Sequence, residues 1–280
     1  MGRALELLVG SATAPSTTFT ALTMAAGNSL TIRSAPLDSK IYLLQAWADN
    51  QTAGTFRIRS PRLHDNVQGI RMDVTASDVV PLLPEGIKQM LISQDTLVAE
   101  ITGSAVAGDL ESGAMLLYYD AVPGVDARLA TWEQIAPLIK HLLFVENTLA
   151  LGTAGGYSGE EAINVEFNQF KANTDYALLG YTVDVECLAI RYRGIDTGNL
   201  GVGGPGNETL RQVTAQWFKR LSMMTGLACI PVFNSANADA ILLDGLQDEN
   251  GTDTTVTSHF AELGPTPAGQ FAGAGAAAGR

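Results

Sequence analysis

The sequence predicts an all-β protein built from two similar domains in tandem, and three observations indicate this. The segment SKIYLLQAWADNQTAGTFRIRSP is echoed later in the chain by TDYALLGYTVDVECLAIRYRG. Tyr176 follows Tyr42 by 134 positions, and the Arg-x-Arg pair that starts at Arg191 follows the one that starts at Arg57 by the same 134 positions. Gly is abundant at 29 residues, and turn-forming residues separate short apolar runs, which is typical of many short strands. A repeat of this length indicates two whole domains and not a solenoid.

Composition and charge limit the classes of function. The chain has 280 residues, of which 46% are hydrophobic and 16% charged, against about 25% charged in typical globular domains. Its formal net charge of −12, with no Lys/Arg-rich arm at either end, disfavours general binding to nucleic acid. No convincing signal peptide and no apolar run of the roughly 20 residues needed to span a bilayer is visible. We therefore expect a soluble protein made in a reducing cytoplasm.

The first half is expected to form an arm followed by a β-sandwich. Residues 1–21 are rich in Ala, Thr and Ser without a clear period and are expected to be an N-terminal arm that packs on a neighbour. The first sandwich is placed over 22–123, with a hairpin turn at Gly27-Asn28 and a short helix over 75–83 ended by Pro84. Apolar or alternating runs predict strands over 41–48, 56–60, 90–92, 97–101 and 115–119.

Residues 124–159 are expected to join the two halves as a helix and a linker. Ile135, Leu138, Leu142 and Val145 recur at helical spacing, which predicts a helix from Thr131 to about Val145. Thr131 is a suitable N-cap, and Pro137 is expected to bend the first turns.

The second half is expected to form a second sandwich over 160–264 and a flexible Ala/Gly-rich tail over 265–280. A helix is predicted over 208–224, with Asn207 as its cap and Gly226 as its stop. Strands are predicted over 176–185, 187–193, 228–233, 240–243 and 254–260.

A glycine-rich loop from Gly201 to Gly206 matches the G-x-G-x-x-G pattern of dinucleotide sites. The preceding loop is long, Pro205 lacks a backbone donor, and no acid lies about 20 positions further on. We therefore expect a mobile loop here, and no cofactor.

An oxygen-rich loop of the kind suited to Ca²⁺ contains Asp244, Asp248, Asn250 and Asp253. Its spacing departs from the EF-hand pattern, and Asp-Glu-Asn-Gly is also ordinary turn chemistry. A turn without a metal is the preferred interpretation, and a calcium site stays open.

Titratable and nucleophilic residues show no arrangement typical of catalysis. His64, His141 and His259 lack the spacing of metal ligands, and His141 is expected to pack within the predicted helix. Cys187 and Cys229 lie in apolar runs and are expected to be buried free thiols, with a disulfide between them left open. No catalytic, cofactor-binding or metal-binding residue is predicted, and we do not expect an enzyme.

The three tryptophans are expected to have packing roles. Trp47 and Trp217 lie in apolar elements and are expected in the core. Trp132 begins the joining helix and is expected to be a core residue, with a role as an interface anchor as the alternative.

Two consecutive β-rich halves, each with a helix late in its strand order, resemble the double jelly-roll major capsid proteins. The paired strands over 41–59 and 176–193 carry this resemblance, together with the closing strands MLLYYDAV and TVTSHFAEL. It covers roughly 22–264, and no single motif is specific to the family. It implies two tandem jelly-roll-like β-sandwiches, a homotrimer, and an icosahedral shell around double-stranded DNA. A chain of 280 residues is short for two jelly rolls, so short loops and brief strands are expected.

We therefore expect a structural self-assembling protein, a viral or phage major capsid subunit located in the virion and made in the host cytoplasm. Its expected partners are further copies of itself and other virion proteins, without sequence-specific contacts to nucleic acid. The alternatives are another virion or filament structural protein, or a carbohydrate-binding or hydrolytic β-sandwich. Both chain ends, 1–20 and 265–280, are expected to become ordered only in the assembly.

Overall fold

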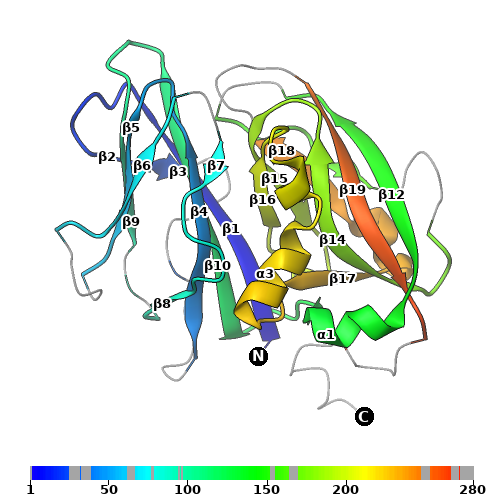
Figure 1. The fold of residues 1–280 in the computed structure, drawn as a ribbon. Coiled ribbons are helices and arrows are strands. Elements are labelled where there is room, and N and C mark those ends of the chain that lie inside the picture. Colours follow the sequence, from blue (N-terminus) through cyan, green and yellow to red (C-terminus); the bar gives the residue numbers. More distant parts are fainter. Residues whose placement is uncertain are drawn as a thin grey trace.

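The structure, a computed structural model, describes residues 2–24, 32, 39–61, 67–76, 79–93, 95, 97–151, 155–163, 170–246, 253–265 and 271. In this part of the chain the residues form four antiparallel β-sheets and few helices (Figure 1). The predicted all-β fold class is confirmed. A search of the same residues for a helix long and apolar enough to cross a membrane finds none.

The first half is a sandwich of two sheets. Its strands are β1 (Gly2–Thr13), β2 (Thr20–Ala21), β3 (Thr23–Met24), β4 (Ile41–Asp49), β5 (Gly54–Arg59), β6 (Ile70–Val74), β7 (Val80–Pro81), β8 (Gln89–Leu91), β9 (Val98–Thr102) and β10 (Leu110–Val122). One sheet has the order β3-β1-β10-β4-β7, with β8 also paired to β4, and the other has the order β2-β9-β5-β6.

The second half repeats this arrangement. Its elements are β11 (Leu129–Ala130), α1 (Trp132–Ile135), the 3₁₀ helix η1 (Ala136–Leu138), β12 (Ile139–Leu149), β13 (Glu161–Ala162), β14 (Asp175–Val183), β15 (Cys187–Arg193), β16 (Val202–Gly206), α2 (Arg211–Thr214), α3 (Trp217–Thr225), β17 (Ile230–Asn234), the 3₁₀ helix η2 (Ser235–Ala240), β18 (Leu242–Leu246) and β19 (Thr254–Leu263). Its sheets have the orders β11-β17-β14-β19-β12 and β13-β18-β15-β16.

Both halves have the same strand order, which is that of the jelly roll. The eight principal strands of the first half are β1, β2, β4, β5, β6, β8, β9 and β10, and those of the second are β12 to β19. Numbered 1 to 8 along the chain, they form the sheets 1-8-3-6 and 2-7-4-5 in each half. The repeated sequence segments form strands 3 and 4 of each half, so the expected internal repeat is confirmed at the level of strand order.

The segment 1–21, predicted to be an arm, instead contains the first strand of the first jelly roll. Along β1, Gly2–Thr13, pairing runs antiparallel to β10 on one edge, and the end of β1 pairs with β3 on the other. Leu5 and Leu7 pack toward the second half, whereas Leu8 packs in the core of the first. Because both faces of the strand are buried, its sequence lacks the polar alternation by which a strand is usually predicted.

The predicted helix over 131–145 is also wrong for most of its length. Thr131 does begin a helix, with a capping box formed with Gln134, but α1 has only four residues. Pro137 lies in η1, and the chain then extends into β12, which pairs with β19 over its whole length. Leu138, Leu142 and Val145 match helical spacing by coincidence, because an edge strand carries apolar residues on both of its faces.

Three smaller predictions need correction. The described part of 75–83 contains β7 and no helix, and the long helix over 208–224 is two short helices, α2 and α3. Gly226 does end α3 in the left-handed conformation, with φ of 69°. The loop expected from Gly201 to Gly206 is mostly the buried strand β16. The strand consists largely of glycine because neighbouring backbone and side-chain atoms occupy the space where a Cβ atom would lie.

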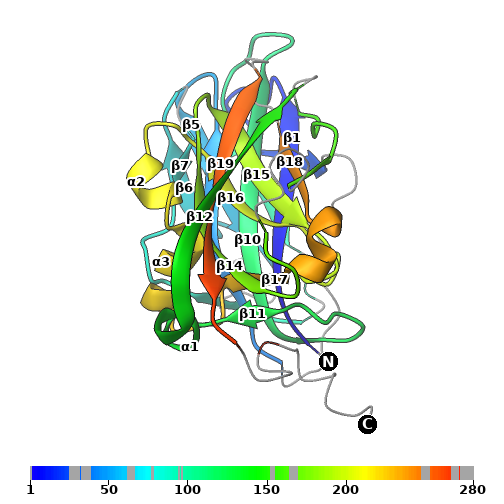
Figure 2. The ribbon, with the colours of Figure 1, turned by 90° about the vertical axis from the view of Figure 1, so that its right-hand side faces the viewer.

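The four sheets stack as successive layers (Figure 1), and the view turned by 90° shows β12 and β19 on the outermost layer (Figure 2). One core lies between the two sheets of the first half. A second core fills the second half and continues through the contact between the halves. There Trp47 and Trp217 pack edge to face with their ring centroids 6.0 Å apart, so their predicted core role is confirmed.

Some predictions lie outside the described residues. These are the hairpin at Gly27-Asn28, the loop containing His64, the middle of the Asp244–Asp253 loop, and most of the tail over 265–280. Within that tail, Phe271 is described and is buried at 3% exposure against the second core.

Candidate functional site

A partly buried cluster of charged and aromatic side chains surrounds the Arg-x-Arg pair of the first half. Arg57 on β5 donates to Glu100 on β9 at 2.6 Å, and Arg59 donates to the same carboxylate at 2.9 and 2.8 Å. The Arg57 guanidinium also stacks over the Phe19 ring at 3.7 Å. These hydrogen bonds, that from Arg59 above all, hold the pKa of Glu100 below its ordinary value.

The second half repeats this cluster at the equivalent strands. Arg191 on β15 donates from Nε to Asp244 on β18 at 2.9 Å, and its guanidinium stacks over the Tyr157 ring at 3.7 Å. Arg193 forms an ion pair with Glu160. The same chemistry therefore recurs in both halves: an arginine on strand 4, an acid on strand 7, and an aromatic ring before strand 2.

The acids of both clusters are held by ion pairs within the chain. Both arginines lie between an acid and a ring, and Asp244 and Glu100 are only 2% and 6% exposed. A substrate would have to displace these ion pairs to reach the carboxylates. In each half the arginine and the acid face each other across two neighbouring strands of the same sheet, and the two halves therefore share this contact.

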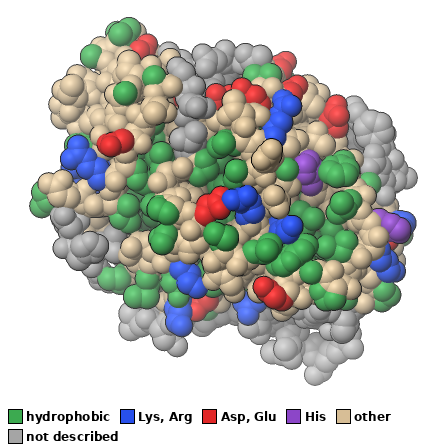
Figure 3. Space-filling view, in the orientation of Figure 1, with side chains coloured by type: hydrophobic (Ala, Val, Ile, Leu, Met, Phe, Trp, Pro, Cys, Tyr) green, Lys and Arg blue, Asp and Glu red, His purple; other side chains and the backbone are tan. Residues whose placement is uncertain are grey.

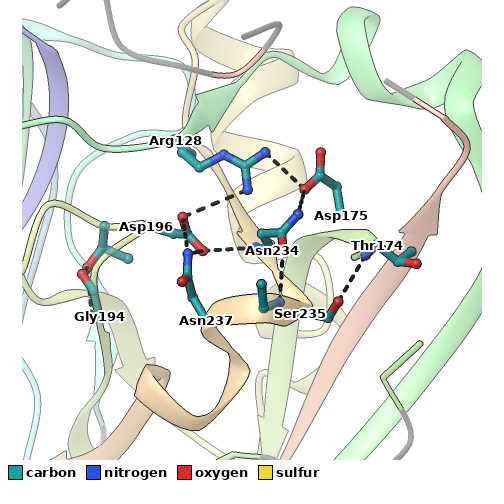
Figure 4. Close-up of polar contacts among 10 residues, drawn as sticks. Arg128, Thr174, Asp175, Gly194, Asp196, Asn234, Ser235 and Asn237 are labelled. Atoms are coloured by element: carbon teal, nitrogen blue, oxygen red, sulfur yellow. Dashed lines mark hydrogen bonds and ion pairs between the residues drawn. The ribbon is translucent and has the colours of Figure 1, made fainter. Parts of the chain in front are cut away.

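A third polar cluster fastens the linker between the halves to the end of the second sandwich (Figure 4). Arg128 donates to Asp175 at 2.9 Å and lies 3.8 Å from Asp196. Asn234 donates through its side chain to Asp175 and through its backbone N–H to Asp196, each at 2.8 Å. Asn237 donates to both Asp196 oxygens at 3.3 Å. Both carboxylates accept hydrogen bonds from side chains or backbone of this chain, so the cluster holds the linker against the second sandwich.

The candidate metal ligands of the sequence do not come together in the described residues. Asp244 is held by Arg191, Asp253 is exposed at the start of β19, and Asp248 and Asn250 lie outside the description. Across the described ranges, no group of three or more His, Cys, Asp or Glu residues is placed to hold an ion.

The cysteines, two histidines and one tryptophan singled out in the sequence lie apart from the three polar clusters. Cys187 and Cys229 are free and buried, as predicted, and burial raises the pKa of Cys229 to about 12. His259 contacts the Ala215 carbonyl through Nδ1 at 3.0 Å, and burial lowers its pKa. His141 is exposed on β12 and does not pack in a helix. Trp132 is half-buried beneath Lys219, whose Nζ lies 4.7 Å from the ring centroid.

A small cavity lies at the contact between the halves. Leu44 and Gln45 line it from β4, and Trp217, Leu221 and Met224 line it from α3. Its volume is about 20 Å³, which is room for about one water molecule and too little for an organic ligand.

The most exposed apolar feature of the second half is the outer face of β12. Leu142 and Phe144 are 59% and 54% exposed, although both lie in a regular strand. Figure 3 shows hydrophobic side chains and histidine together over this side of the molecule. The turn between α2 and α3 covers the neighbouring strands at Gly180 and His259 but stops short of β12.

The corresponding face of the first half is covered. Leu5, Leu7 and Val9 of β1 are buried in the contact with the second half. The outer face of β12 has no third jelly roll to cover it. Sequence analysis missed this surface, because the run Leu142-Leu143-Phe144-Val145 is apolar at every position and shows no alternation that separates its exposed residues from its buried ones.

Comparisons with known proteins do not identify a family. No family model matches the chain, and none of the curated proteins matches it. Among solved structures it is similar to the PBSX exported protein XepA, at 11% identity over 91% of this chain and 86% of that one, with a TM-score of 0.28.

Two other similar structures come from viruses. The Macrobrachium rosenbergii nodavirus protein is 12% identical over 94% of this chain and 91% of that one, with a TM-score of 0.21. An archaeal virus protein with a triple jelly-roll fold and turret assembly is 8% identical over 94% of this chain and 80% of that one, with a TM-score of 0.23. Scores this low do not establish a shared fold, so the jelly-roll assignment rests on the strand order.

Proposed function

We propose that this chain is a self-assembling structural subunit of a virion, and in particular a major capsid subunit of a viral or phage shell. One observation carries the proposal: two complete jelly rolls with the same strand order follow each other in one chain and share a buried contact. Jelly rolls are a recurrent architecture of viral capsid proteins and of lectins.

The side-chain chemistry favours a structural role over catalysis. The buried acids Glu100, Asp244, Asp175 and Asp196 are all engaged with arginine or asparagine of the same chain. Hydrogen bonds also tie the halves together, among them Trp47 Nε1 to the Leu188 carbonyl at 2.8 Å. Such a chain is a rigid building block, which suits a shell.

The lectin alternative receives less support. A sugar-binding face is expected to present several exposed aromatic rings. Among the large hydrophobic side chains that the structure describes as exposed, Phe144 is the one aromatic. The carbohydrate-binding alternative therefore lacks the surface it would need in the described part of the chain.

The expected assembly is a homotrimer located in the virion. Three chains with two jelly rolls each would arrange six similar modules around one axis, which is a shape that tiles a closed shell. The net charge of −12 argues against neutralisation of a nucleic acid by this chain, so its partners would be further copies and other virion proteins.

Mass measurement over a range of protein concentrations tests this proposal. Multi-angle light scattering on purified full-length protein is expected to give a trimer, with larger particles at high concentration. A monomer at every concentration, together with the absence of the protein from particles of the native source, would overturn the proposal.

A further inference from the structure

The outer edge of β12 is a long strand edge without a partner strand in the described part of the chain. The strand pairs with β19 on one side and ends the five-stranded sheet on the other. Leu142, Phe144, Glu146 and Thr148 are exposed at every second position of this strand, and Lys140 and His141 are both exposed at a bulge between Ile139 and His141. Long exposed edges with apolar side chains are sites at which another strand can add.

The sequence of this edge is complementary to itself. If two copies pair antiparallel with Leu143 opposite Leu143, Lys140 of each copy lies opposite Glu146 of the other. In the same register Leu142 lies opposite Phe144, twice. Both Leu142–Phe144 pairs fall on the outer face, because antiparallel partners at these positions point to the same side of the sheet. Lys140 lies at the bulge between Ile139 and His141 and is exposed, as Glu146 is.

We propose that β12 is a contact between two copies of this chain, paired antiparallel about a two-fold axis at Leu143. The proposal rests on the proposed function in that it specifies one of the contacts of the assembly. The pairing joins two five-stranded sheets into one continuous sheet and brings the exposed Leu142 and Phe144 side chains of both copies together.

The charges along β12 favour a second copy of this chain, and not an unrelated strand, as the partner of this edge. The net charge of −12 opposes contact between copies, so a self-contact needs local attraction. Lys140 and His141 lie at one end of the strand and Glu146 toward the other, which provides that attraction only in the antiparallel register. A two-fold contact does not by itself close a trimer, so it would connect trimers to one another.

Disulfide trapping tests the register. Full-length Leu142→Cys and Phe144→Cys proteins are mixed and mildly oxidised. Opposite residues in antiparallel strands have Cβ atoms about 4.5–5.5 Å apart, whereas diagonal neighbours lie at roughly 7–8 Å. The mixture is therefore expected to form a covalent dimer of one copy of each, and each variant alone to cross-link poorly because disulfides reach no further than about 7 Å between Cα atoms.

A matched control uses Thr148→Cys, which is also exposed on the same strand face. Mixed with Phe144→Cys, its thiol would lie about 20 Å from its counterpart in the proposed register. This mixture is expected to give no disulfide above background. The two native cysteines are buried and free, and the wild-type protein controls for any contribution from them.

Charge reversal tests the same contact without a covalent bond. Lys140→Glu and Glu146→Lys are each expected to weaken the two-fold association by about tenfold, since each places like charges opposite each other twice. The double variant restores opposite charges at both positions and is expected to associate like the wild type. Circular dichroism and thermal unfolding check that each variant is folded.

The outcomes separate this contact from the proposed function. Assembly of the wild type without the mixed disulfide, or with no response to charge reversal, overturns the β12 contact and leaves the function standing. A two-fold dimer with the expected disulfide but no larger particle supports the contact and counts against the shell. A strictly monomeric wild type overturns both.

Discussion

At the scale of single residues, the two halves share more chemistry than sequence identity suggests. Arg57 and Arg191 occupy the same strand of each jelly roll, and each lies between an acid and an aromatic ring. The two clusters differ in how many arginines hold the buried acid. Glu100 accepts hydrogen bonds from Arg57 and Arg59. In the second cluster, Arg191 donates to both Asp244 oxygens, and Arg193 does not donate to Asp244.

This difference predicts unequal costs of removing the two arginines. Arg191→Ala leaves Asp244 buried without its partner and is expected to lower the free energy of unfolding by about 3 kcal/mol or more. Arg57→Ala leaves Glu100 paired with Arg59 and is expected to cost about 1 kcal/mol. Urea unfolding at neutral pH measures both. Equal losses would show that the second arginine gives no protection.

The lowered pKa of Glu100 predicts a pH-dependent contribution to stability. A carboxyl whose pKa is depressed in the folded state stabilises the protein above its unfolded pKa, here near 4.5, and loses that effect as the pH falls through the folded pKa. Glu100→Gln is therefore expected to be clearly less stable than the wild type at pH 7 and to approach it below about pH 4. Urea unfolding at several pH values measures the gap, and a gap that does not change with pH would contradict this prediction.

At the scale of elements, the sequence predicted best those strands and helix ends whose structure shows in the local pattern of apolar, polar and capping residues. Apolar runs predicted strands over 41–48 and 176–185, and the structure has β4 at Ile41–Asp49 and β14 at Asp175–Val183. Thr131 and Gly226 were recognised as helix ends because capping depends on local backbone geometry.

The elements that were missed depend on the contact between the halves or on the surface. β1 is buried on both sides because the second half packs on it, and β16 consists largely of glycine because other groups lie close above it. The sequence of β12 looked helical because Leu142 and Phe144 stay exposed on an edge. No local pattern reports such tertiary contacts, and the exposed edge was therefore missed as well.

The central position of β1 predicts that the N-terminal segment is essential for folding. Deletion of residues 2–13 removes a strand that pairs with β10 over its whole length and lies in both cores. The truncated protein is expected to be insoluble or to lack a cooperative thermal transition. If it unfolds cooperatively near the wild-type temperature, β1 is the dispensable arm that the sequence first indicated.

Because α2 and the turn after it pack closely on β14, a larger residue at Gly180 is expected to destabilise the protein. A Cβ atom there would collide with the Thr214 carbonyl and the Ala215 backbone, which cannot move without displacing α2. Gly180→Ala is expected to cost about 1–3 kcal/mol through overpacking. Gly159→Ala is the control, because nothing lies within 4 Å of a Cβ at that site. Chemical unfolding that showed equal stability for the two variants would rule out close packing of the helices on β14.

At the scale of the whole molecule, the chain is one four-layered body made from two copies of one plan (Figure 1). In the first jelly roll, the outer face of the sheet that contains β1 is covered by the second jelly roll. In the second jelly roll, the turn between α2 and α3 covers part of the corresponding face, and the outer face of β12 stays exposed. In the described residues, this exposed face of β12 is where the proposed contact with a second copy would form.

Cryo-electron microscopy of the assembled full-length protein tests the central claim most directly. We predict closed particles whose repeating unit contains two jelly rolls per chain, with the β12 edges of adjacent copies side by side. Single monomers in vitrified samples at all concentrations, with no closed particles or ordered arrays, would contradict the account.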